Sequence, residues 1–147
     1  MHKIFGEKEN APYLNREGAY LIPLCGESVA VIETPKGYFL IGGGIEAGEA
    51  HETCLHRECL EETGCEATVG ECIGSAETYT VHPVLGHFHP IQTYYLGRLS
   101  APVTHPSESD HRLVWLSAAE AVDAMYSEMQ AWAIARAMER VQPEGGR

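Results

Sequence analysis

The sequence predicts an α/β fold in which a mixed β-sheet lies between helices, as an α/β/α sandwich. Short apolar stretches bounded by turn residues recur along the chain as far as Leu116, and such stretches are typical of strands. Three other segments, one in the middle of the chain and two near its C-terminal end, have the end signals and apolar spacing of helices. Strands interspersed with helices in this way indicate a layered arrangement around the sheet.

The N-terminal part of the chain is expected to form strands and turns. Its apolar stretches are separated by Gly26 and by the turn at Pro35 to Gly37, because glycine and proline favour turns. The last stretch leads into a loop of three glycines at 42–44. The expected elements are an irregular or edge segment, two strands, a turn and a short strand, in the order 1–17, 19–24, 29–33, 34–37 and 38–41.

The segment after these glycines has the pattern of a helix. Leu55 and Cys59 lie four residues apart and give the segment an apolar stripe that packs on a sheet. Gly64 follows Thr63 and is a natural C-terminal stop. Acidic residues favour the positive end of the helix dipole, and three occur near the expected start: Glu46, Glu49 and Glu52.

The C-terminal part is expected to supply three more strands and two helices. Ser117 is a good N-cap for the first of these helices. Trp115 and Trp132 are both expected in the core. Further core residues on the last helix are Met129, Ala133 and Met138. The expected strands are 72–80, 91–99 and 113–116, the helices are 117–126 and 127–141, and residues 142–147 are expected to be a frayed tail.

Three carboxylates in the central helix are the main chemical signal of the sequence. Glu58, Glu61 and Glu62 are spaced by three and four residues, so a helix places them within about 100° of one another on one face. Like charges at this spacing repel, and a divalent cation removes the repulsion. Mg²⁺ prefers carboxylate oxygens and also binds substrate phosphates. Arg57 lies beside the acidic face and is expected to pair with Glu49 or a neighbouring carboxylate, fixing the loop against the helix.

The segment 43–65 resembles the box that defines the Nudix, or MutT-type, pyrophosphohydrolases. That box reads Gly, five residues, Glu, seven residues, Arg-Glu, an apolar residue, any residue, Glu-Glu, any residue, Gly and an apolar residue. The matching residues here are Gly43, Glu49, Arg57, Glu58, Cys59, Glu61, Glu62, Gly64 and Cys65. Two departures are mild: cysteines occupy the apolar positions, and Ile41 stands before the glycines where the family often has proline.

The resemblance implies a Nudix-type sandwich and hydrolysis of a diphosphate that joins a nucleoside to another group. It also implies that Glu58, Glu61 and Glu62 are catalytic and bind Mg²⁺, with Mn²⁺ as a substitute. A backbone carbonyl of the glycine loop, that of Gly42, is implied as a further ligand. Structural roles are implied for Gly43, Glu49, Arg57 and Gly64.

The sequence leaves the general base open between a box glutamate and a carboxylate from another loop. Glu108 and Asp110, which precede the strand expected at 113–116, are the candidates outside the box. Many relatives have a glutamate just before the strand that contains the tryptophan, whereas this chain has Arg112 there. That difference favours a base within the box.

Other residues are weaker candidates for contact with substrate. Tyr38 precedes the glycines where relatives often place an aromatic residue, so it is a candidate for stacking on a base and equally for the core. His87 and His89 alternate along an expected strand near His82, and substrate contact or the surface is favoured over a transition-metal site. Further aromatic candidates of the same kind are Phe88, Tyr79 and Tyr94.

Composition limits the class of protein. The 147 residues and 44% hydrophobic content suit a single domain over residues 1–147. A net charge of −11 argues against binding of long nucleic acids, which needs clustered Lys and Arg.

No apolar stretch approaches a membrane span or a signal peptide. Five cysteines without a CxxC motif favour a reducing cytoplasm. The sequence leaves the oligomeric state open, and a homodimer is one of the states that it allows.

Three classes of function are compatible with these observations. The favoured class is an active pyrophosphohydrolase of small nucleotides. Among its substrates, nucleoside triphosphates come first, and dinucleoside polyphosphates, ADP-ribose and nucleotide sugars are the alternatives. The second class is a catalytically silent sensor domain that binds a nucleotide, but no acidic position of the box is eroded. The third is a divalent-ion-binding protein without nucleotide chemistry, which leaves the glycine loop and the Arg57–Glu49 pair unexplained.

Overall fold

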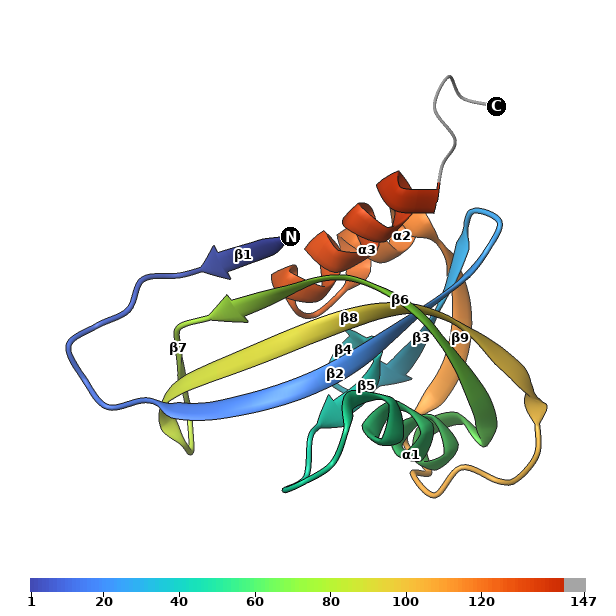
Figure 1. Cartoon of the computed structure of the whole chain (residues 1–147), viewed down its shortest axis with the longest axis horizontal. Helices are drawn as coiled ribbons and strands as arrows, with labels where there is room; N and C mark the ends of the chain where they lie inside the picture. The colour runs from blue at the N-terminus through green and yellow to red at the C-terminus, as the bar shows by residue number, and fades with distance from the viewer. Residues whose placement is uncertain (142–147) are drawn as a thin grey trace.

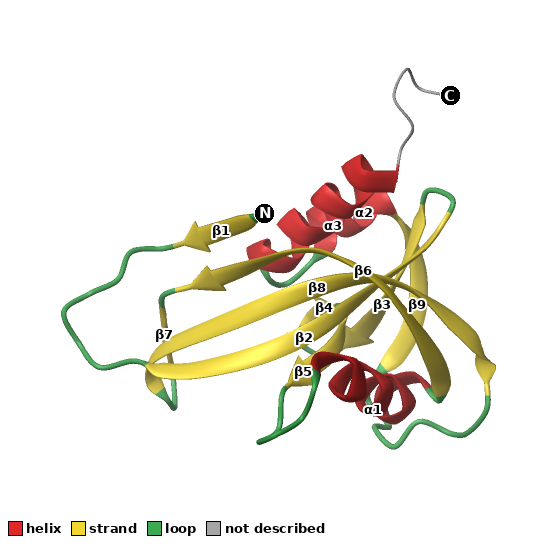
Figure 2. Ribbon diagram, in the orientation of Figure 1, coloured by secondary structure: helices red, strands yellow, loops and turns green. Residues whose placement is uncertain are grey.

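The computed structural model describes residues 1–141 and confirms the predicted α/β fold. One long, strongly curved sheet passes between α1 and the pair α2 and α3 (Figure 1). Figure 2 shows the same view by secondary structure, with the helices on two sides of the strands. The helices are α1 (His51–Thr63), α2 (Ala118–Ala124) and α3 (Glu128–Val141). None of the helices within residues 1–141 is long and apolar enough to span a membrane.

The sheet is mixed. Its strands are β1 (His2–Phe5), β2 (Leu14–Cys25), β3 (Ser28–Thr34), β4 (Gly37–Phe39), β5 (Ile41–Gly44), β6 (Cys65–Thr78), β7 (Thr80–His82), β8 (Gly86–Pro102) and β9 (Arg112–Ser117). The main order is β1-β6-β8-β2-β3-β4, with β5 paired to β2, β7 to β8 and β9 to β3. The β1–β6 and β2–β8 pairs are parallel, whereas the other pairs are antiparallel.

Alternation along β2 separates two apolar cores on the two faces of the sheet. Ala19 and Leu21 are fully buried against the α1 side, where Leu55 and Cys59 complete the packing. Ile22 is equally buried but belongs to the other core. Neighbouring side chains on a strand point to opposite faces, so one strand contributes to both layers. The predicted apolar stripe of α1 is therefore confirmed.

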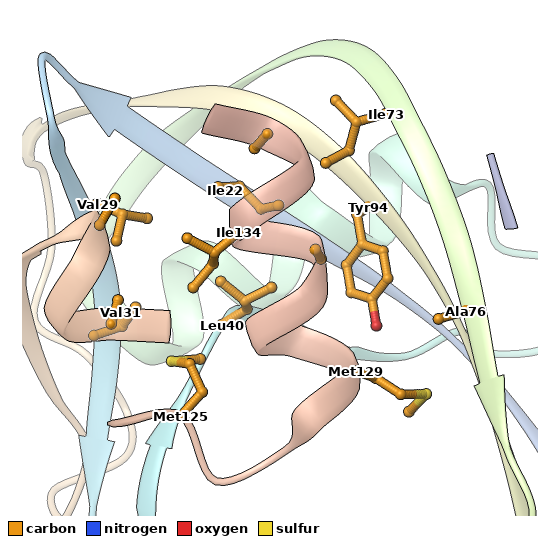
Figure 3. Packing of buried hydrophobic residues seen from close by; sticks show 14 residues of the cluster. Ile22, Val29, Val31, Leu40, Ile73, Ala76, Tyr94, Met125, Met129 and Ile134 are labelled. Carbon is orange, nitrogen blue, oxygen red and sulfur yellow. The ribbon is translucent and has the colours of Figure 1, made fainter. Parts of the chain in front are cut away.

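The second core lies under α2 and α3 (Figure 3). Ile134 of α3 packs among side chains of β2, β3 and β8, and the ring of Tyr94 lies beside it with no exposed surface. Ser117 caps α2 as predicted, in a capping box with Glu120. Trp132 packs against this core, but Trp115 on β9 is 48% exposed. The prediction that Trp115 belongs to the core was wrong: its neighbours Val114 and Leu116 pack against this core, so Trp115 points to the opposite face of β9, where its ring stays half exposed.

The strands of the second half are longer than predicted. β6 begins at Cys65, seven residues before the predicted start, and β8 spans Gly86–Pro102. The two strands form an irregular antiparallel pair with bulges near Cys72. Pairing with a neighbouring strand thus overrides the polar local sequence, as it often does in sheets. The helix expected at 117–126 ends at Ala124, and the tail expected at 142–147 lies outside the described residues.

Two more boundaries near the glycines were wrong. Gly42 to Gly44 belong to β5 rather than to a loop, because they pair with β2. Leu40 separates β5 from β4, so the short strand expected at 38–41 is divided in two. The three acids lie near the start of α1 as predicted: the helix begins at His51, Glu46 and Glu49 come just before it, and Glu52 is in its first turn.

Candidate active site

The glycine strand β5 lets backbone and carboxylates come into close contact. Gly42 has a φ of 147°, where residues with side chains are strained. A Cβ at this position would also lie 2.2 Å from the carbonyl oxygen of Ala19. At Gly43 a Cβ would lie 2.3 Å from Oε2 of Glu58. The absence of these side chains allows the acidic face of α1 to approach the strand.

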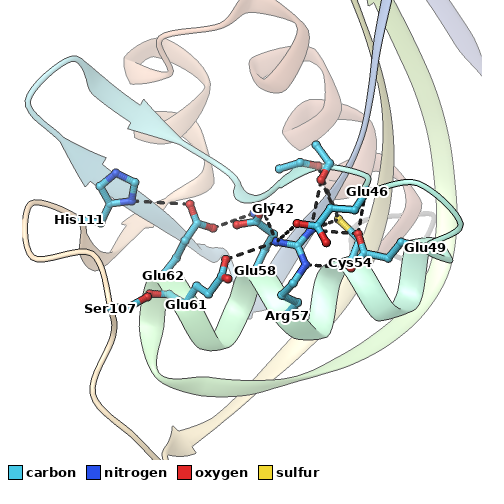
Figure 4. Close-up of polar contacts among 12 residues, drawn as sticks. Gly42, Glu46, Glu49, Cys54, Arg57, Glu58, Glu61, Glu62, Ser107 and His111 are labelled. Carbon is cyan, nitrogen blue, oxygen red and sulfur yellow. Dashed lines mark hydrogen bonds and ion pairs between the residues drawn. The ribbon is translucent and has the colours of Figure 1, made fainter.

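Helix α1 places the three carboxylates beside this strand (Figure 4). Its opposite face is anchored in the core by Leu55 and Cys59. Gly64 ends the helix in the left-handed conformation with φ 74°, and its N–H donates to the carbonyl of Leu60. The core contacts of Leu55 and Cys59 fix the rotation of the helix, and the direction of the acidic face follows from it.

Arg57 ties the acidic residues together. Its Nε and Nη2 donate to the two carboxylate oxygens of Glu49 at 2.8 and 3.0 Å. Its Nη1 lies 3.2 Å from Glu58 and 3.4 Å from Glu61, and Nη2 also donates to the carbonyl of Gly44 at 3.2 Å. A planar guanidinium suits several oxygens at fixed directions. The predicted Arg57–Glu49 pair is present, and it fastens the loop before α1 to the helix.

Glu62 is the most buried of the three carboxylates, with 8% of its surface exposed. The N–H of Gly42 donates to its Oε1 at 3.0 Å. Burial nevertheless raises the pKa of Glu62 to about 8, and the charge of Glu58 acts in the same direction. Burial also raises the pKa of Glu58, with Arg57 opposing the shift. The positive groups near this face therefore do not balance the negative charge of its carboxylates.

The donor set fits a divalent metal ion. Carboxylate oxygens are the ligands that hard cations prefer, and a bound cation supplies the positive charge that Arg57 alone does not provide around Glu62. Glu58, Glu61 and Glu62 are brought together as predicted. Gly42 is brought to Glu62 through its N–H. The metal roles of these residues stay predictions.

The raised pKa of Glu62 predicts a pH-dependent response to metal. Its folded-state pKa of about 8 lies above the ordinary value of 4.5, so its contribution to stability is full below pH 4.5 and is lost as pH rises through 8. In EDTA, the melting temperature of the wild type relative to Glu62→Gln should fall over this range. Mg²⁺ should restore several degrees at pH 8 and less at pH 6. Scanning calorimetry of both proteins measures this, and a response equal in the two would contradict it.

The loop before β9 lies over the end of α1. Ser107 donates from its N–H to the carbonyl of Glu61 at 2.9 Å. Nδ1 of His111 lies 3.7 Å from Oε2 of Glu62 (Figure 4). Its Nε2 lies 3.3 Å from Glu108. Glu108, Asp110 and His111 each offer a ligand atom within 4.8 Å of the others. The two outside candidates for the base are thus close to the box.

His111 was missed by the sequence reasoning. Its Nδ1 is buried, and it has no hydrogen-bond partner within residues 1–141. The available signal was its position directly after Asp110, in a loop already singled out for its carboxylates. Arg112, which stands where relatives have a glutamate, pairs instead with Glu33 on the neighbouring strand.

Several weaker candidates do not meet at the box. Tyr38 donates its hydroxyl to Glu33 at 3.2 Å, and it is the next residue, Phe39, that lines the cavities near the site. The histidines do not form a joint cluster within the described residues. His87 contacts Glu9, His89 is buried between Asn15 and Glu77, and His82 accepts from the N–H groups of Val84 and Leu85. Phe88 packs edge-on against His82.

A cavity of about 410 Å³ opens beside the acidic face. Glu62, Gly42 and His111 line it together with Phe39 and Lys36. Lys36 offers one positive charge near the carboxylates. The cavity therefore combines a candidate cation site with an apolar wall and a basic group, as a phosphorylated ligand requires.

Gly43→Ala should disturb the site without unfolding the protein. The added Cβ displaces the carboxylate of Glu58, which lies at the end of a flexible side chain and can move. Misplacement of a catalytic group by about 1 Å costs on the order of 100-fold in rate. We expect kcat to fall by about 10- to 100-fold while the melting temperature changes by only a few degrees. An unchanged kcat would show that the position of Glu58 is unimportant.

Comparisons with known proteins agree with this geometry. A comparison with curated proteins found no match. Among solved structures, the chain is similar to a NUDIX hydrolase from Nitrosomonas europaea, with 16% identity, 86% of this chain and 90% of that chain covered, and a TM-score of 0.70. It is also similar to the ORF135 protein of E. coli, with 24% identity, 90% and 96% coverage, and a TM-score of 0.63. These two likenesses show the fold. The model of the NUDIX domain matches residues 14–138, so the chain belongs to the Nudix family of hydrolases, which act on pyrophosphate bonds in general.

Proposed function

We propose that this chain is a Mg²⁺-dependent pyrophosphohydrolase of small nucleotides, with nucleoside triphosphates as the preferred class. Nudix proteins generally use a divalent metal and act on small nucleotides. The observation that carries the proposal is the gathering of Glu58, Glu61 and Glu62 at a glycine strand, next to a cavity that contains a basic residue. Mn²⁺ is the expected substitute for Mg²⁺.

The residues of the chain have distinct proposed roles. Glu58, Glu61 and Glu62 would hold the cation, with the Gly42 carbonyl as a further ligand. A cation held there would neutralise part of the phosphate charge that repels the attacking nucleophile and would stabilise negative charge on the leaving oxygen. Glu62 lines the cavity and is fixed by the Gly42 N–H, so we assign to it the orientation of the attacking water. Arg57 is a positioning residue that keeps Glu58 and Glu61 in place.

His111, Glu108 and Lys36 lie outside the box and have secondary roles in this proposal. His111 faces Glu62, and Glu108 contacts His111 from the same loop. The two carboxylates flank the ring of His111, which lines the cavity. Lys36 is placed to meet a phosphate oxygen there. The single domain over 1–147, the cytoplasmic location and the homodimer stay predictions.

A substrate panel tests the function directly. The purified protein with Mg²⁺ is offered nucleoside triphosphates, ADP-ribose, nucleotide sugars and dinucleoside polyphosphates, and mass spectrometry identifies the products. We expect nucleoside monophosphate and pyrophosphate from a triphosphate. A different product pair would name one of the alternative substrate classes. Turnover that is unaffected by EDTA would contradict the metal dependence, and nucleotide binding without any turnover would favour the silent sensor.

A further inference from the structure

A second cavity, of about 400 Å³, lies on the face of the sheet that carries α3. Its lining comes from β2, β8, the start of α3 and the aromatic residue Phe39, and also from the end of β6 and from β7. Two of the weaker candidates from the sequence, His82 and Phe88, are among the lining residues. Arg16 and Gly44 also line it, and the carbonyl of Gly44 accepts a hydrogen bond from Arg57 of the box. The preceding residue of β5, Gly43, faces Glu58 instead, so β5 lies between the acids of α1 and this cavity.

Two glutamines in the wall have amide groups whose orientation is determined by their partners. The N–H of Leu40 donates to Oε1 of Gln130 at 2.8 Å. A backbone N–H can only donate, so the oxygen of the Gln130 amide must face Leu40 and its Nε2 must face the other way. That Nε2 donates to Oε1 of Gln92 at 3.2 Å. The hydroxyl of Tyr94 donates to the same oxygen at 2.8 Å.

These hydrogen bonds among Leu40, Gln130, Gln92 and Tyr94 leave the Nε2 group of Gln92 available to the cavity. The oxygen of Gln92 accepts two hydrogen bonds, whereas its Nε2 has no hydrogen-bond partner within the described residues. An amide nitrogen donates and does not accept. Reversal of the Gln92 amide would bring its nitrogen against the nitrogen of Gln130, which is 2% exposed and held by Leu40. The cavity wall thus presents a fixed donor.

The rest of the wall suits a planar ring. Phe39 and Tyr126 pack with ring centroids 5.1 Å apart, and both line the cavity. The phenol of Tyr20 lies flat on the strand, since a Cβ on Gly18 would be 2.9 Å from its ring. Aromatic surfaces of this kind stack on nucleobases without regard to their identity. Discrimination between one nucleobase and another then depends on the hydrogen-bonding groups of the cavity wall.

A row of three residues sets the direction of a bound nucleotide. Gln92, Gly18 and Gly44 lie directly opposite one another on β8, β2 and β5. Adjacent strands are about 4.8 Å apart, so the row spans about 10 Å from Gln92 to Gly44. A Cβ on Gly44 would lie 2.8 Å from the guanidinium of Arg16. Arg16 is exposed and has no ion pair within residues 1–141. A donor and a cation therefore occupy opposite ends of the row.

We propose that this cavity is the nucleobase subsite of the chain and that Gln92 is its specificity-determining residue. Phosphates lie toward Arg16 and the box, and the base edge opposite the sugar meets Nε2 of Gln92. That edge carries a carbonyl oxygen in uracil, thymine, guanine and hypoxanthine, and an amino group in cytosine and adenine. The wall accordingly selects bases with the carbonyl, because an amino group would meet a donor that then stays unpaired. This inference rests on the function proposed above.

Two matched pairs of ligands test the inference. NMR titrations in EDTA compare UMP with CMP and IMP with AMP, because within each pair the members differ at the edge in question. We expect the carbonyl member of each pair to bind about 10-fold tighter or better, with dissociation constants in the millimolar range or below. Equal affinities within both pairs, or no binding of any of the four, would overturn the proposal.

Variants of Gln92 make the test specific. Gln92→Glu keeps an oxygen for Tyr94 and Gln130 and replaces only the atom that faces the cavity, so the preference should reverse in both pairs. The added charge affects both members of a pair alike, so the ratio of their dissociation constants is free of this general effect. Gln92→Met removes the donor without charge and should bring both ratios to about one. Ratios that stay at the wild-type value in Gln92→Met, with an unchanged circular dichroism spectrum, would contradict the role of Gln92.

Binding without metal separates this inference from the proposed function. A carbonyl preference in the absence of turnover would refute the hydrolase proposal and leave the subsite intact. Turnover of all nucleotides without preference would refute the role of Gln92 and leave the hydrolase intact.

Discussion

Glu62→Gln is expected to lower kcat/KM for the hydrolysed nucleotide on the order of 1,000-fold, which corresponds to about 4 kcal/mol of transition-state stabilisation. The substitution keeps the shape of the side chain and an oxygen for the N–H of Gly42. It removes only the negative charge that holds the cation and orients water in the proposed mechanism. Steady-state kinetics at saturating Mg²⁺ measure the loss.

A control on the same helix makes this result interpretable. Glu52 lies in the first turn of α1 with a side chain that is 70% exposed, and its partner there is His56 at 3.3 Å. Glu52→Gln removes the same charge outside the acidic face and should leave kcat/KM within about two-fold, as surface changes usually do. Equal losses in Glu52→Gln and Glu62→Gln would mean that overall charge, rather than the position of Glu62, controls the rate.

The acidic face was predictable because its geometry is local. The spacing of Glu58, Glu61 and Glu62 places them on one face of any helix, and Gly64 marks where that helix ends. Leu55 indicates the buried side for the same reason. Short-range periodicity therefore carries both the element and the orientation of its side chains.

Long-range pairing explains most of what was missed. Residues 65–71 look polar, yet they form the start of β6 because Cys65 and residues 67–69 pair with β8. The proximity of His111 to Glu62 depends on how the loop before β9 crosses the end of α1. Neither contact joins residues that are close in sequence, so no local pattern encodes it.

The choice between adjacent aromatic residues shows the same limit. Tyr38 was singled out as a stacking candidate, whereas Phe39 lines the cavities. Successive strand residues point to opposite faces, and the pairing of β4 with β3 places Phe39 opposite Ile32, which also lines the cavity beside the acidic face, and Tyr38 opposite Glu33. The Gln92–Gln130 contact likewise needs α3 to dock on the sheet. The residues proposed to select the nucleotide are thus positioned by contacts between distant segments, whereas the carboxylates of the box are positioned by their spacing within one helix.

Arg57→Ala is expected to lower the melting temperature by about 5 to 10 °C, because it leaves several carboxylates without their common partner. Arg57 contacts Glu49 through two hydrogen bonds and also reaches Glu58, Glu61 and the carbonyl of Gly44. The loop before α1 loses its tie to the helix in the same step. Thermal unfolding followed by circular dichroism measures the loss, and kcat should fall as well since Glu58 and Glu61 are no longer positioned.

A double-mutant cycle with Glu49→Gln tests whether the pair acts as a unit. Hydrogen bonding to Arg57 lowers the pKa of Glu49 to about 2, below the ordinary 4.5. The stability from this group is therefore present above pH 4.5 and is lost as pH falls toward 2. Arg57→Ala should remove that acid-dependent part of the unfolding curve, and the double variant should lose less than the sum of the single losses. Additive losses with an unchanged acid dependence would show that Arg57 stabilises the box through Glu58 and Glu61 rather than through Glu49, which would make its role electrostatic at the site instead of structural in the loop.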